Sequence, residues 1–132
     1  MSKSPNGTHT AVLHYGGEIR FGPEYHELSI DSYLLKGKLF GSVLAWSQDS
    51  RYLAAQEWLT TDYGTGPITR AVIFDLARSL YAPLKKTDKG FAQDFIFRGE
   101  AFIYKKHFHA RGEVVEVELN LTDIRNWQEF GS

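Results

Sequence analysis

The sequence predicts a mainly β fold, an antiparallel sandwich or a strongly curved sheet with a short C-terminal helix. Aromatic residues make up 14% of the chain, and they stand in short runs with valine, isoleucine and threonine. Glycine, asparagine and aspartate separate these runs, a pattern typical of strands and turns rather than of helices. Strands are expected at residues 8–15, 18–21, 25–30, 40–47, 52–60, 68–76, 91–98, 102–110 and 113–121.

The length of 132 residues predicts one domain, with residues 1–7 expected to be disordered. Two half-length domains would each be too small to bury a good core without covalent staples. The chain has no cysteine, which excludes disulfides, thiolate metal sites and a cysteine nucleophile. A net charge of -1 gives no overall attraction to nucleic acid or to a membrane surface.

The three middle strands are expected to form a meander. Residues 68–76 carry apolar side chains on both faces, which indicates a central strand that is covered on two sides. After residue 121 the pattern changes, and Thr122 or Asp123 is expected to cap a short helix that ends at Phe130. A further helical turn is expected at residues 77–80.

Two tight hairpin turns are predicted, at residues 15–18 (Tyr-Gly-Gly-Glu) and 110–113 (Ala-Arg-Gly-Glu). A register shift of one residue would move every apolar side chain to the opposite face, so the hydrophobic pattern restricts the second hairpin's pairing. The pairs expected there are Phe108–Val115, Tyr104–Leu119 and Phe102–Leu121 on one face, and His107–Glu116 and Lys105–Glu118 on the other.

Sequence motifs for catalysis are weak. Gly41-Ser42 lacks the second glycine of a serine-hydrolase elbow, and residues 64–67 (Gly-Thr-Gly-Pro) lack the lysine of a phosphate-binding loop. His107 and His109 share a strand face with Glu116 nearby, but a zinc site needs further ligands, so a solvated His107–Glu116 pair is the favoured interpretation. We therefore expect no enzyme, no catalytic residue, no cofactor and no metal site.

The charge is unevenly distributed along the chain. Residues 78–111 contain eight basic and three acidic residues, a balance of +5, whereas residues 112–132 contain five acidic residues and one basic residue, a balance of -4. Basic residues interleaved with aromatics on a sheet can hold single-stranded nucleic acid, although a core of aromatics coated by lysines gives the same pattern. Nucleic-acid binding is therefore the alternative function, through Lys85, Lys86, Lys105 and Lys106.

A second candidate surface surrounds the glycine-rich turn near residue 64. It combines two acidic and two aromatic residues, namely Glu57, Trp58, Asp62 and Tyr63. Aromatic side chains anchor many protein interfaces, and acidic side chains steer a basic partner. The competing interpretation is that Trp58 packs in the core and that the other residues form an ordinary loop.

Residues 46–54 (Trp-Ser-Gln-Asp-Ser-Arg-Tyr-Leu-Ala) resemble the hairpin of a β-propeller blade of the TolB or WD-repeat kind, and residues 71–76 resemble its next strand. Gln48 and Ser50 stand where proline and glycine are common in those families. A closed propeller needs several blades of about 40 residues each, so this chain is expected to keep the hairpin without the propeller.

The whole chain also resembles the small, cysteine-free, β-rich immunity proteins that bacteria keep beside secreted polymorphic toxins. The resemblance rests on the short polar start, on residues 46–54 with Gln56, Glu57 and Trp58, and on the segment 123–130. It implies a non-enzymatic protein of bacterial competition that binds and neutralises a cognate, basic toxin domain. The polar start and the lack of cysteine predict a cytoplasmic location without membrane contact.

Overall fold

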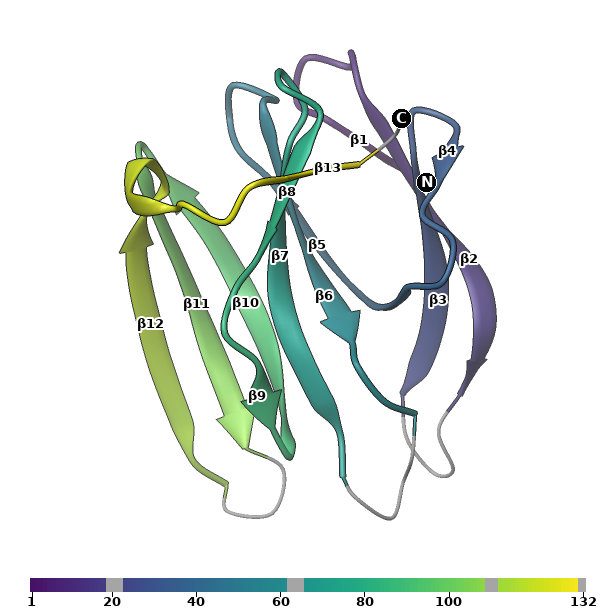
Figure 1. Cartoon of the computed structure of the whole chain (residues 1–132), viewed down its shortest axis with the longest axis vertical. Coiled ribbons are helices and arrows are strands. Elements are labelled where there is room, and N and C mark those ends of the chain that lie inside the picture. The colour runs from purple at the N-terminus through teal and green to yellow at the C-terminus, as the bar shows by residue number, and fades with distance from the viewer. Residues whose placement is uncertain (19–22, 62–65, 109–111, 131–132) are drawn as a thin grey trace.

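The chain folds into two antiparallel sheets (Figure 1), and the computed structural model describes residues 1–18, 23–61, 66–108 and 112–130. Ten strands form the larger sheet in the order β1-β2-β3-β5-β6-β7-β8-β13, with β4 paired to β3 and β9 paired to β7. The smaller sheet has the order β10-β11-β12, and within the described residues neither sheet closes on itself. The strands are β1 (Ser2–Lys3), β2 (Thr10–Glu18), β3 (Glu24–Ile30), β4 (Tyr33–Leu34), β5 (Leu39–Trp46), β6 (Tyr52–Trp58), β7 (Ile68–Asp75), β8 (Leu80–Pro83), β9 (Thr87–Asp88), β10 (Gly90–Arg98), β11 (Ala101–Phe108), β12 (Val114–Asn120) and β13 (Gln128–Glu129).

Strands β6 and β7 lie at the centre and bury both of their faces. On one face, side chains such as Leu53 and Phe74 pack with Leu28 of β3, because the larger sheet curls over itself. On the other face, Ala54 and Ile73 pack against the aromatic side chains of the smaller sheet. The mainly β, antiparallel prediction, the meander β5-β6-β7 and the two-sided central strand are thus confirmed.

Buried polar contacts join the two sheets. Gln56 Nε2 donates a hydrogen bond of 2.9 Å to the carbonyl oxygen of Ala92. Thr69 Oγ1 donates to the carbonyl oxygen of Gly90 and accepts from the backbone N–H of Ala92, both at 2.9 Å. These bonds satisfy groups that would otherwise be unpaired in the core, and therefore fix where β10 lies against β6 and β7.

A buried carboxylate organises one end of the molecule. The side chain of Asp75 is 0% exposed; its Oδ1 accepts from Arg51 Nε at 3.0 Å, and its Oδ2 accepts from Arg51 Nη2 at 2.9 Å and from Arg78 Nε at 2.6 Å. Burial by itself raises the pKa of Asp75, but the hydrogen bonds from Arg51 and Arg78 outweigh it and hold this pKa below its ordinary value. The same bond to Asp75 raises the pKa of Arg51.

The predicted C-terminal helix is wrong. Only a 3-10 turn forms, over Leu121–Asp123, and Asn120 caps it by accepting from the N–H of Thr122 at 2.9 Å. The chain then runs extended, because the half-buried Trp127 packs against the core cluster between the sheets and β13 pairs with the edge of β8. No helix long and apolar enough to cross a membrane occurs in the part of the chain that the structure describes.

The predictions for residues 15–18 and 77–80 are also corrected. The glycines at 16 and 17 lie inside β2, at a bulge in its pairing with β3. A Cβ at Gly17 would lie 2.5 Å from Tyr25 Oη, so the absence of a side chain there makes room for Tyr25. Residues 19–21 of the strand expected at 18–21 lie outside the described residues, and Glu18 ends β2. No helix forms at residues 77–80, since Ser79 has the left-handed φ of 55°. Residues 1–7, expected to be disordered, contain strand β1, which pairs with β2.

The second predicted hairpin exists, with a register that differs by two residues. Phe102 is paired with Leu119 and Tyr104 with Val117, while Lys105 is opposite Glu116. A shift of two residues leaves every side chain on its expected face, since strand side chains alternate with a period of two. The hydrophobic pattern therefore predicted the faces correctly but could not fix the register, and residues 110 and 111 of the predicted turn lie outside the described residues.

Replacing Asp75 tests the buried ion pairs. Asp75→Asn should lower the free energy of unfolding by about 2–4 kcal/mol, because both guanidinium groups lose their buried counter-charge while keeping some contact with water. Urea unfolding followed by tryptophan fluorescence measures this change. The control Asp88→Asn removes an exposed carboxylate 3.9 Å from Lys86 and should change the value by less than about 0.5 kcal/mol. Equal effects of the two variants would contradict the conclusion that the buried ion pairs of Asp75 stabilise the fold.

The lowered pKa of Asp75 predicts a pH dependence. A depressed folded-state pKa means that ionised Asp75 stabilises the fold above its ordinary pKa of 3.8, and that this stabilisation is lost as the pH falls through the lower value. The difference in unfolding free energy between the wild type and Asp75→Asn should therefore be constant above about pH 5 and shrink below about pH 4. Urea titrations at a series of pH values measure it, and a difference that grows on acidification would refute this sign.

Candidate functional site

Glu57 and Trp58, which were predicted to lie on an acidic and aromatic surface, are buried. Trp58 is 4% exposed and packs against Tyr25 and Phe91, with ring centroids 6.2 and 5.7 Å away. Glu57 is also 4% exposed, and its carboxylate accepts from Arg70 Nε at 2.7 Å. Both side chains thus belong to the interior, whereas Asp62 and Tyr63 lie outside the described residues.

The four predicted nucleic-acid contacts do not share one face. Lys85 and Lys86 are exposed between β8 and β9. Lys105 and Lys106 are consecutive, half-buried residues of β11, so their side chains point to opposite faces of the smaller sheet. Glu116 is the cross-strand neighbour of Lys105 and offsets its charge. This arrangement disperses the basic segment instead of forming a single track for a phosphate backbone.

The histidine pair considered as a metal site has other partners. His107 Nε2 lies 2.7 Å from Asp94 Oδ2, across the β10–β11 pairing, and Glu116 is opposite Lys105 rather than His107. His109 lies outside the described residues. Among the described residues, no group of three or more His, Asp and Glu side chains is arranged to hold a metal ion.

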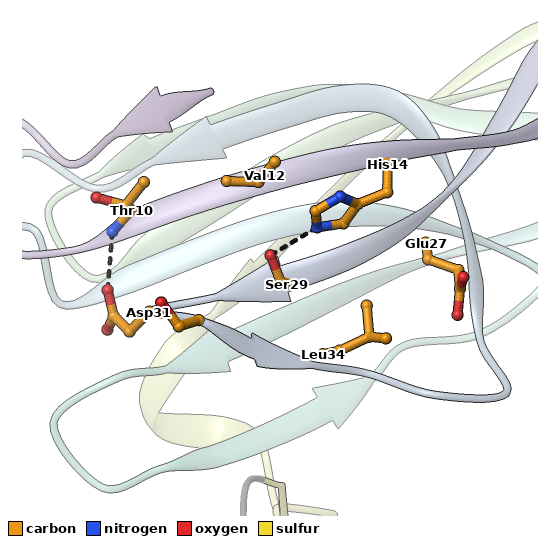
Figure 2. A pocket seen from close by; sticks show the side chains of 8 residues that line it. Thr10, Val12, His14, Glu27, Ser29, Asp31 and Leu34 are labelled. Carbon is orange, nitrogen blue, oxygen red and sulfur yellow. Dashed lines mark hydrogen bonds between the residues drawn. The ribbon is translucent and has the colours of Figure 1, made fainter.

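A hollow of about 890 Å³ lies on the outer side of β2, β3 and β4 (Figure 2). His14 Nε2 and Ser29 Oγ are 2.9 Å apart within it, and the N–H of Thr10 donates to Asp31 Oδ1 at 2.8 Å. In the described part of the chain no acidic side chain hydrogen-bonds to His14, so the Ser–His pair lacks the group that orients a catalytic imidazole. Two pairs of lining groups thus bond to each other, and without an orienting carboxylate on His14 this hollow is a weak candidate for chemistry.

The outer edge of β12 is the strongest candidate for a binding site. Strand β12 (Val114–Asn120) ends the smaller sheet, and no described strand pairs with its outer edge (Figure 1). Val114 is 51% exposed and Val115 is 38% exposed. Glu116 and Glu118 are exposed on the face opposite to the core. A seven-residue strand with a free edge thus offers backbone N–H and C=O groups beside two carboxylates.

The sequence predicts this strand and its acidic balance but not its position at an edge. The alternation in residues 114–120 (Val-Val-Glu-Val-Glu-Leu-Asn) predicts a strand with one apolar face. Whether a further strand lies beside it depends on the order of strands in the sheet. The signal in the sequence for an exposed edge was the pair of valines, Val114 and Val115, beside the two glutamates.

Comparisons with protein families, with curated proteins and with solved structures found no match for this chain.

The burial of Trp58 predicts a structural effect of its replacement. Trp58→Ala should lower the free energy of unfolding by about 3–5 kcal/mol, as expected when a large aromatic side chain leaves the core. The adjacent Leu59 is 40% exposed, so Leu59→Ala is the matched control and should cost less than about 1 kcal/mol. Chemical denaturation followed by circular dichroism measures both. A Trp58→Ala protein as stable as the control would contradict the burial of Trp58 and support its prediction as a surface contact.

Proposed function

We propose that this chain is a non-enzymatic binding protein that holds an extended, basic segment of a partner protein along the free edge of β12. Following the resemblance to immunity proteins, the partner we propose is a bacterial toxin domain that the chain neutralises by occlusion. The observation that carries the proposal is the exposed seven-residue edge of β12 with its two carboxylates.

An added strand would satisfy the backbone groups of the edge and supply the affinity. Extended segments bind sheet edges through main-chain hydrogen bonds, and side chains at alternate positions give the specificity. Glu116 and Glu118 are two residues apart and therefore on one face. Lysine or arginine at alternate positions of the incoming segment would lie opposite them, and each such cross-strand pair contributes roughly 0.2–1 kcal/mol.

The charges on β12 disfavour a second copy of this chain as the occupant. Two copies of β12 paired antiparallel about Val117 would place Glu116 of one copy opposite Glu118 of the other. Like charges directly opposite each other destabilise a strand pair. The same two residues that attract a basic segment thus oppose self-association, which is one way in which proteins protect exposed edges.

A peptide titration tests the edge. The probe is a fluorescent peptide of about eight residues with lysine at alternate positions among valine and threonine, long enough to cover β12 at about 3.4 Å per residue. The variant Glu116→Lys/Glu118→Lys should bind at least about tenfold more weakly than the wild type, because two attractive pairs become repulsive. Fluorescence anisotropy measures the dissociation constants.

The matched control is Glu18→Lys/Glu24→Lys, which makes the same change in net charge at two exposed acids paired across β2 and β3. This control should bind the peptide nearly as tightly as the wild type. Equal losses in the two variants, or equal binding of a peptide with glutamate in place of lysine, would contradict the proposal.

A toxin domain captured by the wild type and the control but not by the β12 variant would support the proposed partner. Capture of nucleic acid in place of such a protein would overturn it.

A further inference from the structure

A second feature of the fold lies beyond the C-terminal end of β12. Turns from both sheets lie at the upper end of the view in Figure 1. A cavity of about 480 Å³ opens among the side chains of these turns. Its lining includes Arg51 before β6, Arg78 between β7 and β8, and Arg125 in the segment after β12. The rings of Tyr52 and Trp127 also line it, and we name this hollow the arginine cavity.

The carboxylate of Asp75 holds two of the guanidinium groups side by side. Arg51 Nη2 and Arg78 Nε both donate to Asp75 Oδ2, at 2.9 and 2.6 Å. One buried negative charge therefore faces two positive charges, and the two arginine side chains remain 41% and 47% exposed. Among the described residues, Arg51 Nη1 and both Nη atoms of Arg78 have no hydrogen-bond partner. These donors are available to a further anion.

Aromatic rings keep both guanidinium groups in place. Arg51 lies 5.0 Å from the centroid of the Tyr52 ring, and Arg78 lies 5.0 Å from the Trp127 ring. The Tyr52 and Trp127 rings stack on each other with centroids 6.5 Å apart. Cation–π contacts and the shared carboxylate thus order the donors before any ligand arrives, which reduces the entropy lost on binding.

The third guanidinium is held by backbone groups. Arg125 Nη1 donates to the carbonyl oxygen of Thr122 at 2.6 Å. The segment that carries it is tied to the smaller sheet, since the N–H of Leu121 donates to the carbonyl oxygen of Glu100 at 2.8 Å. Two carboxylates also line the cavity: Asp49, which accepts from Ser47 Oγ at 2.6 Å, and the exposed Glu100. The site is therefore a set of fixed donors rather than a strongly positive patch.

We propose that the arginine cavity is an oxyanion-binding site that takes a phosphate group. A phosphate group presents several acceptor oxygens, enough to bridge neighbouring guanidinium groups, and arginine is the side chain that recognises such oxygens through paired N–H donors. The phosphate would belong to a small ligand that enters the cavity or to a phosphorylated molecule whose phosphate group alone reaches it.

Titration of the full chain with inorganic phosphate tests the site, with backbone amide NMR shifts as the readout. Saturable shifts confined to residues around the cavity, such as Gly99 and Thr122, are expected at about 10 mM phosphate or below, given a dissociation constant near 1 mM. Arg125→Gln should weaken binding at least about fivefold and Arg78→Lys at least about tenfold, since each removes guanidinium donors. Glu100→Gln should tighten binding by removing a repelling charge.

The matched control is Arg98→Gln, which removes an exposed arginine on β10 that does not line the cavity, and it should bind phosphate as the wild type does. A urea midpoint measured for each variant separates lost binding from lost folding, and Arg125→Gln carries the test if Arg78→Lys unfolds. No saturable shift, or equal weakening by Arg98→Gln, would overturn the proposal. Shifts with acetate but not with phosphate would overturn the choice of phosphate. Binding of inorganic phosphate but not of a nucleoside monophosphate would favour a phosphorylated molecule whose phosphate group alone reaches the cavity over a small ligand that enters it.

Discussion

The burial of β6 and β7 on both faces is the constraint on which the rest of this structure depends. Leu53 and Phe74 need a cover on one side, and Ala54 and Ile73 need one on the other. The larger sheet supplies the first cover by curling, and the smaller sheet supplies the second. Because apolar area on both faces must leave water for the fold to be stable, neither layer can be removed without exposing the centre.

Two-sided burial also decides where binding can occur. The faces of β6 and β7 are occupied by the protein itself, so even charged or polar side chains on these strands, such as Glu57, are committed to internal partners. The two binding sites that we propose therefore lie at the periphery of the described structure: the edge of β12 and the end where turns of both sheets meet. At that end Asp75 stabilises the turns through Arg51 and Arg78, whose side chains remain partly exposed.

Much of the fold was predictable from local pattern, whereas the site was not. Alternation with a period of two identified the long strands and the faces of Phe102 and Tyr104. A two-residue shift leaves this alternation unchanged, so the predicted pairing of β11 with β12 differs by two residues from the observed one. Trp58 has the composition of an interface anchor, but its environment depends on Tyr25 and Phe91, which are distant in sequence. The spacing of Ile124 and Trp127 suggested a helix. The packing of half-buried Trp127 against the core and the pairing of β13 with β8 overrode this local preference.

The sequence by itself determined that this is a mainly β, antiparallel protein without disulfides, and that residues 68–76 lie at its centre. Those properties follow from composition and from side-chain alternation, which are local. Only the tertiary structure decided that β12 is an edge and that Arg51, Arg78 and Arg125 line one cavity. The reason is that strand order and the meeting of distant turns are set by which apolar faces cover each other, and a linear pattern does not encode that choice.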